Sequence, residues 1–141
     1  NELGISLLRS PVFPDFLADE GAQSFTYALL PFAGDWLTGG VLAEAQDLNQ
    51  PLFVQTAQLT DGAWQAIATD PALAISALKP AEDGQGLVLR LYEPAGGTVS
   101  SDLRLPAGWH QGGAVNLLEE PSAEVGPMGP FAIRSVKLQR D

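Results

Sequence analysis

The sequence contains no cysteine and only one histidine, His110. Without cysteine the chain can form neither disulfides nor thiolate metal sites, and we expect a cytoplasmic setting. Zinc sites usually take three or four side-chain ligands, so the lone histidine in "PAGWHQGG" is predicted to be a surface residue. The sequence also lacks a G-x-S-x-G motif and a Cys–His pair, and therefore shows no recognisable nucleophile.

Basic residues are scarce as well: seven Lys and Arg stand against 17 Asp and Glu, for a net charge of −10. Such a surface repels nucleic-acid phosphates and anionic lipids, so we expect neither nucleic acid nor membrane as a partner. No apolar run approaches the roughly 20 residues that span a bilayer. A hydrophobic content of 45% is nevertheless enough for a packed core.

Short apolar segments separated by Gly and Pro dominate the sequence. The pattern predicts one amphipathic helix over residues 39–48 and a hairpin turn at Asp83-Gly84. The predicted strands are residues 3–8, 24–32, 51–59, 72–80, 87–93, 98–105, 112–120 and 131–139. Many short strands with one helix indicate a mainly β protein, an antiparallel β-sandwich forming a single domain over residues 1–141.

Alternation within the later strands predicts which side chains share a face. Leu87, Leu89 and Leu91 fall on one face of their strand. The phase of the last strand is imperfect, and a bulge near Ser135 would correct it. Arginines 90, 104 and 134 are then predicted to point outward as ordinary surface charges.

Carboxylates gather at Asp15, Asp19 and Glu20, and again at Glu119 and Glu120. Paired carboxyl groups are the machinery of glycosidases, and several oxygen ligands suit calcium. Neither spacing matches a calcium loop, so solvated loop charge is the favoured interpretation. Trp36, Trp64 and Trp109 form the other candidate, a platform for stacking sugar rings; packing is the more common role of tryptophan in a small β domain.

Three stretches together carry a family resemblance: "LGISLLRSPVFPD…ADEG…FTYALLPFAGDW", "LNQPL" with "ISALKPAEDGQGLVLRLYEPAGG", and "VNLLEE…GPFAIRSVKL". In this order and at these intervals they resemble the C-terminal β domain of family-38 glycoside hydrolases, the class II α-mannosidases, in their bacterial form. The resemblance implies a sandwich of the galactose-mutarotase-like supersandwich type. One departure is Phe32, where bacterial relatives usually have histidine.

The resemblance implies that this chain is a fragment of a longer enzyme that hydrolyses α-mannosides with retention, through a covalent intermediate. In that family the zinc ion and catalytic aspartate belong to an N-terminal domain, on which this piece would pack. We therefore expect no catalytic residue, no metal and no cofactor within the chain, which should be inactive alone.

Arg9 is the one site residue that the resemblance supplies, because an arginine near this point in the family is associated with the sugar pocket. An arginine fork can hold sugar hydroxyls or fix an active-site carboxylate. It could equally cap a sheet edge or pair with Asp15 or Asp19. Two other functions stay open: a stand-alone carbohydrate-binding module and a purely structural or oligomerisation module.

Overall fold

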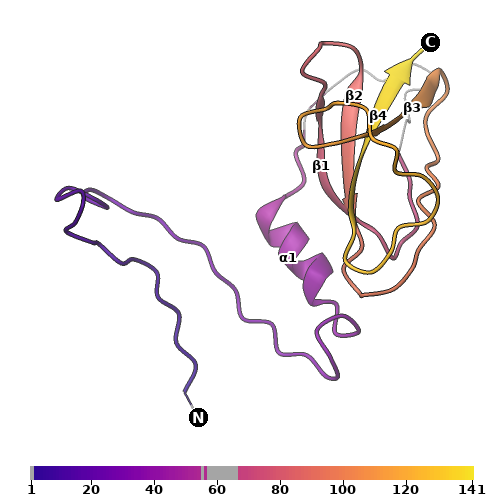
Figure 1. The fold of residues 1–141 in the computed structure, drawn as a ribbon. Coiled ribbons are helices and arrows are strands. Elements are labelled where there is room, and N and C mark those ends of the chain that lie inside the picture. Colours follow the sequence, from indigo (N-terminus) through magenta and orange to yellow (C-terminus); the bar gives the residue numbers. More distant parts are fainter. Residues whose placement is uncertain (1, 55, 57–66) are drawn as a thin grey trace. The chain divides into compact units, whose positions relative to one another are not determined.

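A computed structural model describes residues 2–54, 56 and 67–141, and within them the chain divides into two compact units, Asn1–Leu52 and Phe53–Asp141. The first unit contains the helix α1, and the second contains the strands β1 to β4 (Figure 1). Residues 55 and 57–59 of the predicted strand 51–59 lie outside the described residues, as does Trp64. Nowhere in the described ranges is a helix long and apolar enough to cross a membrane.

Helix α1 spans Val41–Asn49 and confirms the helix predicted from sequence, shifted by one or two residues. It starts after Gly40, whose φ of 73° lies in the left-handed region that glycine tolerates best. It ends at Gln50, whose backbone N–H donates to the carbonyl of Gln46 over 2.7 Å. Pro51 then follows and cannot continue the helix.

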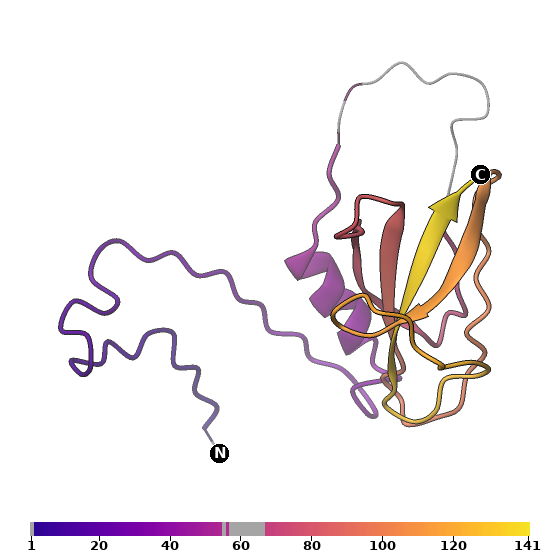
Figure 2. The same ribbon diagram turned by 45° about the horizontal axis from the view of Figure 1, so that its top comes forward.

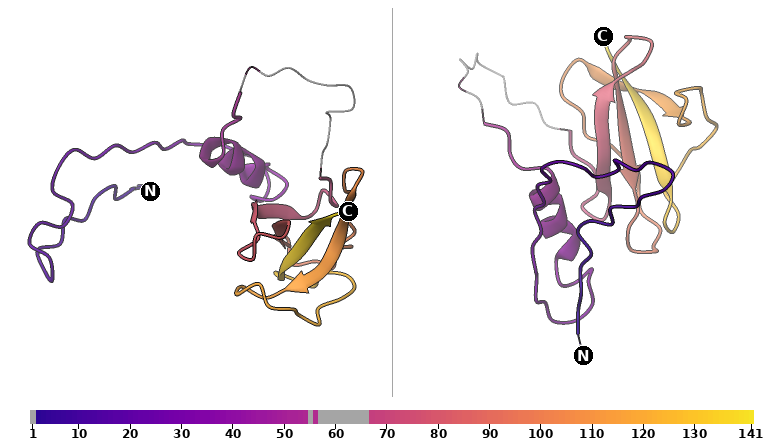
Figure 3. Two further views of the ribbon diagram at one scale, coloured as in Figure 1. Left: turned by 90° about the horizontal axis from the view of Figure 1, so that it is seen from above. Right: turned by 90° about the vertical axis from the view of Figure 1, so that its left-hand side faces the viewer.

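The strands predicted at residues 3–8 and 24–32 are wrong for this structure, in which both segments are irregular. Figure 3 shows the chain before α1 as an extended, winding segment without arrows. A strand is held by hydrogen bonds to a neighbouring strand, and no such neighbour pairs with these segments within the described residues. Their apolar side chains are exposed in consequence; Leu3, for example, is 87% exposed.

The second unit is built on one antiparallel sheet in the order β1-β2-β4-β3 (Figures 1 and 2). The strands are Ala74–Pro80, Leu87–Tyr92, Trp109–Val115 and Ile133–Arg140 for β1 to β4. The hairpin between β1 and β2 confirms the Asp83-Gly84 turn, where Gly84 takes a φ of 71° and Asp83 Oδ1 accepts the Gln85 N–H over 2.9 Å. The mainly β class with one short helix is confirmed.

Two other predicted strands differ from the observed ones. Residues 98–105 form single bridges, Val99 with Met128 and Arg104 with Ala68, rather than a strand. Strand β3 starts earlier than predicted and stops at Val115, because Asn116 Oδ1 accepts the N–H groups of Leu118 and Glu120 and turns the chain.

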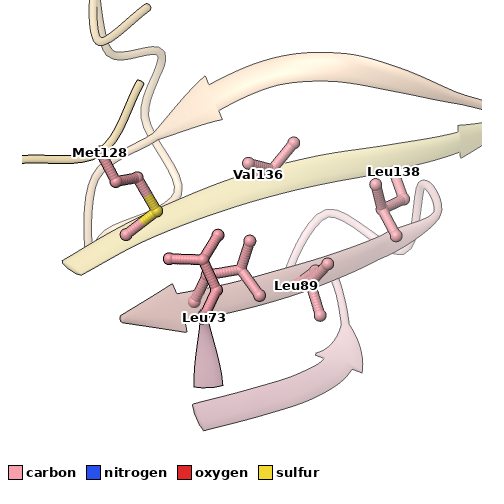
Figure 4. Close-up of a cluster of buried hydrophobic side chains, with 6 residues drawn as sticks. Leu73, Leu89, Met128, Val136 and Leu138 are labelled. Atoms are coloured by element: carbon pink, nitrogen blue, oxygen red, sulfur yellow. The ribbon is translucent and has the colours of Figure 1, made fainter. Parts of the chain in front are cut away.

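The main core cluster lies on one face of this sheet, where Leu89 and Leu91 are completely buried, and Val88 is buried in a second cluster with Ala81 and Val115. Leu89 is paired with Val136 of β4, and Leu73 and Met128 contribute to the main cluster from outside the strands (Figure 4). The predicted common face of Leu87, Leu89 and Leu91 is confirmed, since Leu87 packs against this cluster.

The register of β4 corrects two further predictions. Its pairing with β2 runs without interruption through Ser135, and the bulges lie instead on β1, between Ile75 and Ala77, and on β3, between Gln111 and Gly113. Without a bulge at Ser135, Arg134 keeps the phase of Val136 and faces the core side, and its side chain is only 10% exposed. The outward orientation predicted for Arg134 is therefore wrong.

Candidate functional site

Arg9 immediately precedes a closed loop in the first unit. The Ser10 N–H donates to Asp19 Oδ2 over 3.0 Å and joins the two ends of this loop. Ser10 and Asp19 both have positive φ, 46° and 61°, which fixes sharp bends at the two ends. Inside the loop, Asp15 Oδ1 accepts the N–H of Leu17 over 3.0 Å. Asp15 and Asp19, two of the three acidic residues that cluster here in the sequence, thus accept hydrogen bonds from the backbone of the loop.

The Arg9 side chain is exposed, and no carboxylate lies within 4.0 Å of it among the residues that the structure describes. Asp19 uses its carboxylate on the Ser10 backbone, and residues 3–8 are not a sheet edge that Arg9 could cap. Neither structural alternative for Arg9 is therefore observed. Its role at a sugar pocket stays a prediction.

Phe32, the departure from the family pattern, packs on the turn that leads into α1. A Cβ built on Gly39 would lie 2.5 Å from Phe32 Cδ2, so only glycine allows the ring to sit there. Asp35 organises the same turn, because its Oδ1 accepts the N–H groups of Leu37 and Thr38 over 2.9 and 2.8 Å. The hydrogen bond from Thr38 is the main reason that the pKa of Asp35 is lowered. Phe32 and Asp35 are thus residues that shape the backbone.

Glu93 is the buried carboxylate of the second unit and stands in the "LYEPAGG" segment at the end of β2. Its oxygens accept backbone N–H groups from Ala95, Gly96 and Phe131 over 2.8, 2.7 and 3.0 Å. Its own N–H donates to the carbonyl of Ala132 over 3.0 Å. One carboxylate therefore joins the turn after β2 to the segment that enters β4.

Electrostatics agree with this structural role. Burial is the largest influence on the Glu93 pKa and raises it, but the hydrogen bonds from Phe131, Ala95, Gly97 and Gly96 together outweigh burial and lower the pKa overall. A carboxylate held ionised and fully occupied by backbone donors is unsuited to proton transfer. Sequence reasoning assigned no role to Glu93; its only signal was a lone acidic residue between an apolar strand and a Pro-Ala-Gly-Gly turn.

The neighbouring carboxylates Glu119 and Glu120 also accept hydrogen bonds within the second unit. Glu119 accepts the Glu82 N–H over 2.8 Å and lies 2.7 Å from Lys79 Nζ, and the Lys79 hydrogen bond is the main cause of its lowered pKa. Glu120 accepts from the Asn116 side-chain amide over 2.9 Å. The favoured interpretation of loop charge is refined by this finding, because these carboxylates hold particular loops in place.

His110 is half-exposed, and its Nδ1 lies 2.9 Å from Asp141 Oδ1. In the described part of the chain, no group of three or more His, Cys, Asp or Glu side chains is placed to hold a metal ion. The described residues therefore do not fit the zinc ion of the family, and we assign them no part in zinc chemistry.

Trp36 and Trp109 are the tryptophans that belong to the described residues. Trp109 packs partly buried against the core cluster at the start of β3. Trp36 belongs to the first unit and is 47% exposed.

Comparison with known proteins gives one family. Residues 72–136, which include β1, β2 and β3, match the model described as "Glycosyl hydrolases family 38 C-terminal beta sandwich domain". "Alpha-mannosidase 2C1" of Homo sapiens is 37% identical over 97% of this chain, and the Mus musculus protein of the same name is 35% identical over 98%. "Alpha-mannosidase G" of Dictyostelium discoideum is 35% identical over 70% of the chain.

The chain spans only 13%, 15% and 10% of the lengths of these three relatives. No solved structure matches it. The family prediction is confirmed, and the family description supports the sandwich type of the fold. The three relatives are eukaryotic proteins, so they lend no support to the bacterial form that the sequence motifs suggested.

Proposed function

Since this chain carries the C-terminal β-sandwich domain of glycosyl hydrolase family 38, we propose that it is the non-catalytic C-terminal part of a zinc-dependent, retaining α-mannosidase. The observation that carries the proposal is the match to two alpha-mannosidases along 97% and 98% of this chain. The finer sandwich type, a galactose-mutarotase-like supersandwich, is part of the same proposal.

The chemistry of the described residues favours a structural role over a catalytic one. Retaining glycosidases need two carboxyl groups about 5–5.5 Å apart, one acting as nucleophile and the other as acid and base. Two carboxylates of the second unit that are largely buried, Glu93 and Glu119, are occupied by backbone N–H groups and by Lys79. Hydrolysis, and the zinc ion with it, is therefore assigned to another part of the parent enzyme.

The first unit supplies the surface that we propose packs on the catalytic domain. Large apolar side chains are exposed along residues 3–37, among them Phe13, Phe16 and Leu29. Soluble proteins rarely leave so many apolar side chains in water, and such surfaces usually mark contacts with other protein. Arg9 lies in the same segment and is proposed to reach the sugar pocket from there.

Two preparations test the proposal: the parent enzyme and this chain alone, each assayed with 4-nitrophenyl α-D-mannoside. We expect the parent enzyme to release nitrophenol, to lose activity when a chelator removes zinc and to regain it when zinc is restored. The chain alone should release none. Hydrolysis by the chain alone would refute its non-catalytic role. The control substrate is 4-nitrophenyl α-D-glucoside, and a parent enzyme that cleaved it but not the mannoside would refute the proposed substrate.

A further inference from the structure

A hollow of about 620 Å³ lies on the core side of β4, next to the edge strand β3. Its walls come from β3, from β4 and from the segments 98–102 and 124–127. The wall segments are fixed, since Val99 and Met128 exchange backbone hydrogen bonds of 2.9 and 2.8 Å. All of these parts belong to the second unit, within the region that matches the family model.

Arg134 anchors one wall of this hollow. One terminal guanidinium nitrogen, Nη1, donates to Ser101 Oγ over 2.8 Å and to the Gly126 carbonyl over 2.6 Å. Its Nε is buried without a hydrogen-bond acceptor among the described residues, and Glu124 Oε2 lies 3.5 Å away. Because the guanidinium is held from two sides, it fixes the segment 124–127 against Ser101 and places a positive charge beside the hollow.

Three polar side chains of the lining retain free hydrogen-bonding capacity within the described residues. Asp102 uses Oδ2 to accept from Ser100 Oγ over 2.6 Å, which leaves Oδ1 for another donor. Glu124 uses Oε2 for the 3.5 Å ion pair with Arg134 Nε, which leaves Oε1 for another donor. The side-chain amide of Gln111 lines the hollow and has no hydrogen-bond partner in the part of the chain that the structure describes. The hollow thus offers two carboxylates and an amide, with Val99, Val125 and Val136 as apolar surface between them.

This combination of groups fits a neutral polyol better than an ion. A carboxylate can accept two adjacent hydroxyl groups of a pyranose, an amide can both donate and accept, and valine surface suits the C–H face of the ring. Two carboxylates against one arginine leave the hollow slightly negative, which disfavours phosphate or carboxylate ligands. Too few carboxylates are present for a metal site. We propose that this hollow is a non-catalytic binding site for a pyranose sugar.

A neighbouring hollow extends the proposed site to more than one sugar ring. It shares Ser100 and Asp102 with the first hollow and is lined on its far side by Thr69 and Arg104. The Thr69 hydroxyl is buried without a hydrogen-bond partner among the described residues. A linear oligosaccharide that crosses Asp102 would place one ring in each hollow.

The test is a titration of the 141-residue chain with methyl α-D-mannopyranoside, followed by ¹H–¹⁵N NMR spectra. A small ligand in an open polar site should bind with a Kd on the order of millimolar, so sugar is added to about 50 mM. We expect shifts confined to residues 98–102, 111 and 124–127. A mannobiose should shift residues 68–70 as well and bind more tightly.

Glu124→Ala is the decisive variant, because this carboxylate is 57% exposed and its ion pair with Arg134 Nε is long, at 3.5 Å. Arg134 keeps its hydrogen bonds to Ser101 Oγ and the Gly126 carbonyl when Glu124 is replaced. The substitution should weaken binding about tenfold, the effect of losing a charge-assisted hydrogen-bond pair. The matched control is Glu82→Ala, which removes another exposed carboxylate beside a basic residue, Lys79, outside the hollow. The control should bind sugar as the unaltered chain does.

Three results would overturn the proposal: no shifts at 50 mM sugar, equal binding by the Glu124→Ala variant, or the same shifts produced by methylammonium chloride and not by the sugar. The readout is binding by the isolated chain and needs no hydrolysis. A failure to bind sugar would leave the proposed α-mannosidase assignment intact. A parent enzyme without α-mannosidase activity would likewise leave the binding result intact.

Discussion

Replacing Leu89 with alanine should destabilise the second unit by about 3–4 kcal/mol. Leu89 lies on the central strand β2, between Leu78 of β1 and Val136 of β4, and is 0% exposed. The substitution removes three carbon atoms from the core, about 2.4 kcal/mol at ~0.8 kcal/mol for each group. The remainder comes from the cavity, because a side chain in the middle of a sheet is surrounded by backbone that cannot collapse into the gap.

Urea unfolding followed by circular dichroism measures this loss. The midpoint should fall while the slope against urea stays constant, since the same surface is exposed on unfolding. In thermal unfolding the loss corresponds to a lowering of Tm by about 4–8 °C per kcal/mol for a unit of this size. Leu117→Ala is the control, because that leucine is 72% exposed and its loss should stay within about 0.5 kcal/mol. A Leu89→Ala loss below about 1 kcal/mol would refute a close-packed core at this position.

Three other predictions concern single groups. The pKa of Glu93 is lowered in the folded chain, so its stabilising effect is present above its unfolded pKa of about 4.3 and is lost as the pH falls through the folded value. The urea midpoint of the Glu93→Gln variant should therefore fall less steeply on acidification than that of the unaltered chain. The same dependence of the midpoint on pH in both proteins would contradict this. Gly86→Ala should unfold the hairpin end, because the added Cβ would lie 2.0 Å from the Leu138 carbonyl oxygen. Gly84→Ala has open space around the added Cβ and should cost only about 1–2 kcal/mol of stability, from its positive φ. Equal urea midpoints for the two variants would contradict this difference. Arg9→Ala in the parent enzyme should lower kcat/KM for the aryl α-mannoside at least about tenfold, and unchanged kinetics would remove Arg9 from the sugar pocket.

The elements that sequence predicted well are those whose signals are local. Helix α1 has apolar residues at helical spacing and ends just before a proline. The β1–β2 hairpin has an Asp-Gly turn between two apolar runs, and the turn conformation that it requires is observed. In both cases neighbouring residues alone determine the backbone conformation, so a single sequence is sufficient.

The strands that sequence predicted wrongly depend on distant partners. Residues 24–32 have the aromatic and β-branched composition of a strand, yet no partner within the described chain supplies the hydrogen bonds. Residues 98–105 alternate properly, but among the described residues they form β-bridges at two points only, Val99 and Arg104. Composition gives a segment the capacity to pair, and only the arrangement of the rest of the protein decides whether it does.

The Glu93 site was invisible to sequence for a related reason. Its hydrogen-bond donors are backbone N–H groups, two of them in the adjoining turn and one, that of Phe131, 38 residues away. Backbone donors have no sequence signature, so the carboxylate looked like any other loop charge. The hollow beside Arg134 was missed because its polar side chains come from four separate segments.

The arginines show why the environment decides the role of a charged residue. Arg9, Arg90 and Arg134 each follow the same pattern, one arginine within an apolar run, and would be interpreted alike. Arg90 bonds Ser135 Oγ over 3.0 Å on one face of the sheet, whereas Arg134 turns to the core side, where Ser101 and the Gly126 carbonyl satisfy it. A buried guanidinium is stable only where such acceptors are present. The role of Arg9 therefore depends on the acceptors that face it in the parent enzyme, and the Arg9→Ala kinetics measure their contribution.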